Sequence, residues 1–309
     1  MIVLTLCSAL MISTVEDQRP MDERWQLVWS DEFDGDAINT SNWTFDVDCW
    51  GGGNDERQCY TDRAENARVA DGMLIIEAHR EAWSGAPFPE RWGRTGEPVS
   101  REFTSARLTT RGLAAWRYGR FEVRAQLPFH QGSWPAIWMM PEDSVYGGWA
   151  ASGEIDIMEA INLGELCADC ATGVENRVWG TIHYGGPAPD NTYSGNSVTL
   201  DDPAAFHTYG LEWTPDEIVW LLDGAPYARQ TAEGWHTTGS DRASAPFDQA
   251  FHIILNLAIG GTWPESSNLG GVSEQDFPRQ MRIDFVRVHA CPSDPETLQS
   301  CRDGGSDDD

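Results

Sequence analysis

The sequence predicts an all-β protein built as a sandwich of two antiparallel sheets. Segments in which apolar and polar residues alternate recur along the chain, and clusters of Gly, Pro and Asp separate them. In the clearest one, residues 118–127, the side chains of Phe121, Val123, Ala125 and Leu127 share one face. No window of a dozen residues carries a convincing helical stripe. Many strands separated by turn residues favour a double-sheet β-sandwich.

The expected strands follow one another from residue 25 to residue 288. They are 25–33, 74–79, 103–112, 118–127, 179–185, 206–213, 218–224, 252–259 and 281–288. The segments 206–213 and 218–224 read as a hairpin, because the Pro-Asp pair between them is a turn sequence.

Length and composition limit the number of domains and the classes of partner that the protein can have. A chain of 309 residues fits one large all-β domain or two small ones, and it shows neither an internal repeat nor an obvious linker. Fifteen Trp and eleven Phe residues are typical of proteins that stack on flat apolar faces such as sugar rings. The formal net charge of −28 argues against nucleic acid, anionic membranes and polyanionic substrates. We expect a monomer that acts on a neutral substrate.

Both ends of the chain differ in composition from the middle. Residues 2–13 are apolar but too short to span a membrane, and they lack the basic start of a full signal peptide. We favour a secretory signal or a disordered terminus over residues 1–18, rather than a buried strand. The β-sandwich domain is expected over 22–292, followed by a disordered acidic tail over 293–309.

Six of the seven cysteines fall into three local pairs, if Cys7 is set aside. The pairs are Cys49 with Cys59, Cys167 with Cys170, and Cys291 with Cys301. Such pairs suit loop-closing disulfides in an oxidising compartment, which predicts a secreted, extracellular protein. The Cys-Ala-Asp-Cys spacing resembles half a zinc site, but no second half follows. A redox role is disfavoured without a βαβ context.

The most informative segment is Glu154-Ile-Asp-Ile-Met-Glu159, which places three carboxylates in an apolar run. In a helix, Glu154 and Asp156 would point to nearly opposite sides, whereas in a strand they share a face. Glu159 joins them if Ile157 or Met158 is absorbed by a β-bulge. The alternative, a solvated acidic strand edge, fits the flanking residues less well because these look buried.

Two glutamates that flank an aspartate on such a strand suit glycoside hydrolysis, in which one Glu attacks while ionised and the other is a protonated acid. Their Cα atoms would lie about 13 Å apart. Side chains that lean inward could bring the carboxyl groups to the ~5–5.5 Å of a retaining enzyme. Asp156 would hydrogen-bond the nucleophile and keep the pKa of the other acid high.

These residues resemble glycoside hydrolase family 16, in the bulged form of its motif that laminarinases, agarases and κ-carrageenases carry. Further blocks resemble the family in its own order across residues 25–290. They are Leu27-Val-Trp-Ser-Asp-Glu-Phe33, Ser133-Trp-Pro-Ala-Ile-Trp-Met-Met-Pro141, Gly180-Thr-Ile-His-Tyr-Gly185, Phe206-His-Thr-Tyr-Gly-Leu-Glu-Trp213 and Leu255-Asn-Leu-Ala-Ile-Gly-Gly-Thr-Trp-Pro264. The resemblance implies a jelly-roll sandwich with a substrate cleft on its concave face.

The resemblance also implies roles for single residues. Glu154 is the nucleophile, Asp156 its partner and Glu159 the acid/base, while His183 approaches the acid/base end of the triad. Without the resemblance, His183 would be read as a satisfied core histidine. The substrate-contacting residues that it implies are Asn54, Trp134, Trp138, His183 and Trp263. Trp149 is also expected beside the cleft, because it precedes the nucleophile by five residues.

A structural Ca²⁺ is implied on the face away from the cleft, with ligands near Glu32, Gly72 and Asp284. Carboxylate and backbone carbonyl oxygens suit this ion. No catalytic cofactor is expected, because three acids on one strand cannot surround a metal alone.

The blocks look most like laminarinases, which implies a retaining endo-β-1,3-glucanase acting on laminarin-like glucan by double displacement. The bulged motif disfavours lichenase-type members, and the net charge disfavours sulfated substrates. An agarase-like hydrolase, a mixed-linkage β-1,3-1,4-glucanase or a non-catalytic glucan-binding module are the alternatives. The two glutamates weigh against the last of these.

Overall fold

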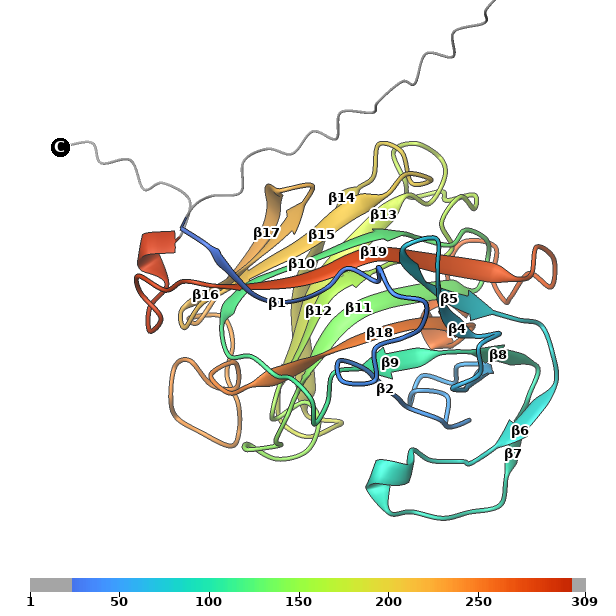
Figure 1. Cartoon of the computed structure of the whole chain (residues 1–309), viewed down its shortest axis with the longest axis horizontal. Coiled ribbons are helices and arrows are strands. Elements are labelled where there is room, and N and C mark those ends of the chain that lie inside the picture. Colours follow the sequence, from blue (N-terminus) through green and yellow to red (C-terminus); the bar gives the residue numbers. More distant parts are fainter. Residues whose placement is uncertain (1–23, 302–309) are drawn as a thin grey trace, which may run out of the picture.

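Two antiparallel sheets lie face to face in the computed structural model, which describes residues 24–301 (Figure 1). One sheet has the strand order β17-β16-β15-β10-β19-β5-β4, with β1 paired to β19 as its eighth strand. The other has the order β14-β13-β12-β11-β18-β9-β2. The predicted β-sandwich is thereby confirmed, and the expected terminal segment 1–18 lies outside the described residues.

The strands have the following bounds. Those of the eight-stranded sheet are β1 (Gln26–Asp31), β4 (Ala67–Ala70), β5 (Met73–Ala78), β10 (Gly119–Gln126), β15 (His207–Trp213), β16 (Glu217–Leu222), β17 (Ala225–Thr231) and β19 (Arg279–Ala290). Those of the seven-stranded sheet are β2 (Thr44–Phe45), β9 (Arg107–Thr109), β11 (Ser133–Pro141), β12 (Glu154–Glu159), β13 (Arg177–Gly185), β14 (Asn191–Thr199) and β18 (Phe251–Ile259).

Smaller elements lie outside the two sheets. Two short pairs form from β3 (Gln58–Tyr60) with β8 (Phe103–Ser105) and from β6 (Trp83–Gly85) with β7 (Val99–Arg101). Three short helices are η1 (Glu90–Trp92), α1 (Thr262–Glu265) and η2 (Gln299–Cys301). Within residues 24–301, no helix is long and apolar enough to cross a membrane.

The core lies between the sheets, where every second side chain of a regular strand points inward. In β10 the inward residues are Phe121, Val123 and Ala125, all fully buried, as the alternation predicts. In the facing sheet, Ile155 of β12 and Ile182 of β13 are equally buried. Because side chains alternate across a strand, the neighbours of these residues must point to the outer face of their sheet.

The structure refines the strand predictions. The hairpin β15–β16 is confirmed, but the expected strand 103–112 is two strands, β8 and β9, which separate at Ala106 and join different sheets. The prediction lacked the edge strands β14 and β17. Both are largely exposed, so they carry little of the apolar alternation by which a half-buried strand is found.

All three expected disulfides form: Cys49–Cys59, Cys167–Cys170 and Cys291–Cys301. The domain boundary expected after residue 292 is too early. Residues 293–301 are ordered, because the last disulfide and a small cluster of Trp25 and Leu298 hold them against the sandwich. The rest of the predicted tail, 302–309, lies outside the described residues.

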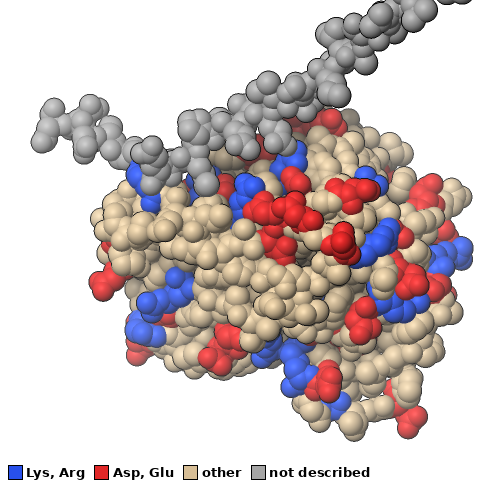
Figure 2. Space-filling view, viewed as in Figure 1, with Lys and Arg blue, Asp and Glu red and all other residues tan. Residues whose placement is uncertain are grey.

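The charged side chains are interspersed on the face that Figure 2 shows. All 21 basic residues are arginines, since the chain contains no lysine. Many of them pair with acids, as in Arg287–Glu32 at 2.7 Å and Arg177–Glu175 at 2.6 Å. These pairs neutralise basic charge locally, so the excess of acids stays dominant.

Candidate active site

Strand β12 carries the three carboxylates and contains the predicted bulge. Its register against β11 is Met139↔Ile155, Trp138↔Asp156, Ile137↔Met158 and Ala136↔Glu159. Ile157 is therefore the extra residue. Against β13 the irregularity falls between Asp156 and Glu159. Because one residue is absorbed, Glu154, Asp156 and Glu159 share the outer face, while Ile155, Ile157 and Met158 are buried.

Glu154 lies between a tryptophan and a histidine. The Trp149 indole N–H donates to Glu154 Oε2 at 2.8 Å, and His183 Nε2 lies 3.6 Å from Glu154 Oε1. Burial and the nearby Asp156 carboxylate raise the pKa of Glu154 to about 7, against the lowering effect of His183 and the indole. The carboxyl group thus titrates close to neutral pH.

Glu159 lies at the other end of the strand, beside different aromatic residues. The Trp134 indole N–H donates to Glu159 Oε1 at 2.9 Å. Burial, followed by repulsion from Asp156, raises the pKa of Glu159 to about 8. Burial and the neighbouring negative charge therefore favour a protonated carboxyl group in this row near neutral pH, which an acid beside a nucleophile requires.

His183 contacts the Glu154 end of the carboxylate row, so its expected place at the acid/base end is wrong. Its Nε2 lies 3.2 Å from Asp156 Oδ2, and antiparallel pairing sets His183 opposite Glu154. Trp179 stands opposite Glu159 instead. Burial lowers the pKa of His183, but the close Asp156 carboxylate and the neighbouring glutamates outweigh it and raise that pKa to about 10. The nearby carboxylates thus favour the protonated imidazole.

Aromatic rings extend on both sides of the carboxylates. Beside Glu159, the ring centroid of Trp263 lies 5.6 Å from that of Trp134 and 5.0 Å from that of Trp179. Beside Glu154, the His183 ring lies 5.7 Å from both Trp149 and Tyr193.

Trp138 and Asn54 also lie around this face. The Trp138 indole donates to Asn256 Oδ1 at 2.7 Å, across the pair β11–β18. The backbone carbonyl of Asn54 accepts from the amide of Thr262 at 2.7 Å, which places the Asn54 loop directly beside Trp263. The structure therefore brings all six predicted substrate-contacting residues to the carboxylate-bearing face or its border.

Sequence reasoning missed Trp179, Tyr193 and Asn256. Trp179 could have been found, because it has the same strand parity as His183 in the expected strand 179–185. Tyr193 is 69% exposed on β14, which was not predicted, and only the β13–β14 register places it opposite His183. Asn256 depends in the same way on the pairing of β18 with β11.

Two clusters in residues 24–301 hold three metal-ligating side chains close together. One is Cys167, Cys170 and Glu175, whose cysteines are joined in a disulfide and offer no thiolate. The other is Glu154, Asp156 and His183, which belongs to the carboxylate row itself. Zinc at the first cluster is therefore as unfavourable as the sequence indicates.

The three positions expected around Ca²⁺ lie in or next to strands that pair along one edge of β19 in the eight-stranded sheet. Strands β1 and β5 share one edge of β19, and their pairings stop at Val286 and Ile283. Asp284 lies between these ends, Glu32 directly follows β1, and Gly72 directly precedes β5. The donor set of carboxylates and nearby carbonyl oxygens fits the ion. Each carboxylate also pairs with an arginine, Glu32 with Arg287 and Asp284 with Arg124.

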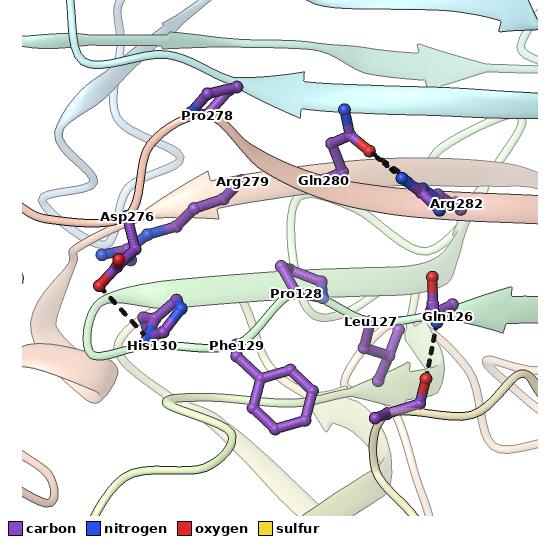
Figure 3. Close-up of a pocket in the computed structure, with 11 residues that line it drawn as sticks. Gln126, Leu127, Pro128, Phe129, His130, Asp276, Pro278, Arg279, Gln280 and Arg282 are labelled. Carbon is purple, nitrogen blue, oxygen red and sulfur yellow. Dashed lines mark hydrogen bonds and ion pairs between the residues drawn. The ribbon is translucent and has the colours of Figure 1, made fainter.

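A pocket lies at the end of β10 and the start of β19 (Figure 3). His130, Arg279 and Arg282 are among its lining residues, and His130 faces Asp276 across it (Figure 3). None of its lining residues is a predicted site residue.

A sheet face that holds two glutamates of raised pKa, an aspartate between them and indoles around them defines a glycoside hydrolase. Residues 54–287 match the family Glycosyl hydrolases family 16. The chain belongs to this family.

Two relatives and one solved structure illustrate the similarity. A protein of Rhodothermus marinus named Beta-glucanase is 42% identical over 295 residues, which cover 93% of this chain and 91% of that protein. A Glucan endo-1,3-beta-glucosidase of Cryptopygus antarcticus is 44% identical over 246 residues, covering 77% and 82%. The X-ray structure of the laminarinase from Rhodothermus marinus superposes with a TM-score of 0.70 over 86% of this chain and 97% of that one.

Proposed function

We propose that the protein is an endo-β-1,3-glucanase that cleaves laminarin-like glucan with retention of the β configuration. The single observation that carries the mechanism is the bulged strand β12, which places Glu154 and Glu159 on one face with Asp156 between them. Burial and the Asp156 carboxylate raise the pKa of both glutamates. One ionised and one protonated glutamate are therefore favoured near neutral pH, and a retaining mechanism needs this combination.

In the first step, the Glu154 carboxylate attacks the anomeric carbon while Glu159 gives its proton to the departing glycosidic oxygen. A covalent glycosyl ester forms on Glu154, and the reducing-end part of the glucan leaves. Burial and the charge of Asp156 raise the pKa of Glu159, so its proton stays in place until the glycosidic oxygen departs. The His183 cation counterbalances Glu154 and Asp156, which lie 3.6 and 3.2 Å from its Nε2.

In the second step, the Glu159 carboxylate takes a proton from water as that water attacks the anomeric carbon. The ester bond to Glu154 breaks, and the sugar leaves with its original β configuration. Glu159 is then protonated again and Glu154 is ionised, so the site returns to its starting state.

The aromatic rings support a neutral glucan as the substrate. Trp134 and Trp263 beside Glu159, and Trp149 and Tyr193 beside Glu154, offer faces and edges for sugar rings on both sides of the scissile bond. Rings on both sides suit a chain that passes across the site, which supports endo action.

A product profile on laminarin, lichenan, agarose and carrageenan tests the proposal. We expect rapid release of reducing ends and oligosaccharides of several lengths from laminarin, slower cleavage of lichenan, and no cleavage of the other two. Cleavage of agarose alone, or binding to laminarin without cleavage, would overturn the assignment.

We also propose a structural Ca²⁺ near Glu32, Gly72 and Asp284. The bound ion would attract the carboxylates of Glu32 and Asp284, each of which already pairs with an arginine, and would thereby stabilise the folded state. We expect millimolar Ca²⁺ to raise the Tm of the EDTA-treated protein. Asp284→Asn should abolish this response, whereas Glu122→Gln, which affects an arginine-paired acid of the same sheet, should keep it. An equal Tm with Ca²⁺ and with EDTA would contradict the site.

We propose, finally, that the protein is secreted and acts as a monomer. Its three disulfides support an oxidising compartment. Activity in the culture medium of the native producer and a monomer mass in sedimentation would agree with this. Activity confined to the cytoplasm, or a stable dimer, would not.

A further inference from the structure

Trp220 joins the far sheet to the catalytic bulge. It belongs to β16 in the eight-stranded sheet, is fully buried, and points into the core between the sheets. Its indole N–H donates to the backbone carbonyl of Asp156 at 2.8 Å. Asp156 immediately precedes Ile157, the extra residue of the bulge. The indole therefore crosses the sandwich to bond the backbone where the ladder is interrupted.

A glycine leaves the room for this contact. Gly180 lies on the inward face of β13, next to β12, between the buried Val178 and Ile182. A Cβ atom at this position would lie 2.2 Å from Trp220 Cδ1 and 2.5 Å from its Nε1. Any larger residue would push the ring away from the carbonyl of Asp156.

A bulge leaves backbone groups without their usual ladder partners, and a buried carbonyl without a donor is costly. A fixed donor at this place favours one position for the extra residue over a slipped register. That position decides whether Glu159 shares a face with Glu154 and Asp156, because a slip of one residue turns side chains to the opposite face.

We propose that Trp220 is a positioning residue, whose indole N–H fixes the bulge at Ile157 and thereby aligns the two glutamates. This inference rests on the proposed function for its catalytic readout. Trp220 does not touch the substrate and acts through the backbone of β12. Gly180 is its steric counterpart, and the pair links the catalytic strand to the opposite sheet.

The test compares Trp220→Phe with Trp213→Phe. Trp213 is an ideal control because it is equally buried, lies in the adjacent strand β15, and also donates its N–H to a backbone carbonyl, that of Phe247 at 3.1 Å. Both variants lose a buried indole hydrogen bond, but only one of them affects the bulge.

We expect Trp220→Phe to lower kcat on laminarin by about 10- to 100-fold with KM changed less than about threefold, since small misplacements cost this much. Trp213→Phe should keep kcat within about twofold at a similar loss of Tm. Equal losses of kcat in both variants, or a normal kcat in Trp220→Phe, would overturn the proposal.

Two further measurements keep the test decisive. Hydrogen exchange of the segment 154–160 should rise in Trp220→Phe and stay unchanged in Trp213→Phe, whether or not the wild type cleaves laminarin. If the wild type does not cleave laminarin but shows this exchange pattern, the proposed function is contradicted and the positioning role of Trp220 is supported. Unchanged hydrogen exchange of residues 154–160 in both variants would contradict the positioning role of Trp220. If Trp220→Phe does not fold, benzothienylalanine at position 220 removes the N–H and keeps the ring, with the same outcomes expected.

Discussion

Glu154→Gln is expected to abolish turnover of laminarin, with kcat reduced by roughly four orders of magnitude or more. The amide is nearly the same size as the carboxylate and still accepts the Trp149 hydrogen bond, but it cannot attack the anomeric carbon. Glucan binding should persist, because the surrounding rings are untouched. Reducing-end assays and a pull-down on insoluble β-1,3-glucan measure the two quantities.

The same variant should be more stable than the wild type at pH 8. Folding raises the pKa of Glu154 from about 4.5 to about 7, so the folded state holds a proton that the unfolded chain releases. The associated stability is present below pH 4.5 and is lost as the pH rises through 7. Glutamine avoids this loss, and its Tm should exceed that of the wild type by a few degrees at pH 8 and equal it at pH 4.

Glu77→Gln is a control variant for which we expect the opposite change in Tm at pH 8. Glu77 lies in β5 of the other sheet and pairs with Arg68 at 2.8 Å. Burial raises its pKa, but the bonds from Arg68 and Gln280 outweigh this and leave that pKa lowered. Its substitution should therefore lower the Tm at pH 8 and leave kcat unchanged. An active Glu154→Gln, or a loss of activity in both variants, would contradict the nucleophile assignment.

Glu159→Gln is expected to remove the alkaline limb of the pH profile. The free enzyme needs Glu154 ionised and Glu159 protonated, so kcat/KM should fall below about pH 7 and above about pH 8. These apparent values belong to the two carboxyl groups together. His183, with its pKa raised to about 10, stays protonated throughout this range. Glutamine at position 159 does not titrate, so the fall in kcat/KM above about pH 8 should disappear.

The leaving group gives the sharper readout of this variant. Natural glucan needs proton donation to the departing oxygen, and losing it should cost about 10²–10⁴-fold in kcat/KM. For an aryl glycoside with an activated phenol as leaving group, the loss of rate in the first step should be far smaller. Equal losses on both substrates, or a persisting limb near pH 8, would show that another group is the acid.

Local patterns explain why much of this site could be predicted from sequence. The period of two places Phe121 inward and Glu154 with Asp156 outward without any knowledge of the neighbouring strands. In a regular strand Glu159 would point to the face opposite Glu154 and Asp156, so a shared face required a bulge. Only the choice between Ile157 and Met158 needed the register against β11.

Contacts between distant strands explain what could not be predicted. The position of His183 depends on the β12–β13 register, which is set across the intervening residues 160–176 rather than by either strand alone. Tyr193 required β14, an exposed strand without apolar alternation. The bond from Trp220 to Asp156 joins residues 64 positions apart across the core. No local spacing carries such information.

The stereochemistry of the first product tests the account most directly. Proton NMR of wild-type hydrolysis, recorded in the first minutes before mutarotation, distinguishes the two anomers at the new reducing end. Double displacement through Glu154 predicts the β anomer first, with the α anomer appearing only as the sugar equilibrates. Appearance of the α anomer first would mean direct attack by water, and it would contradict the role of Glu154 as the nucleophile.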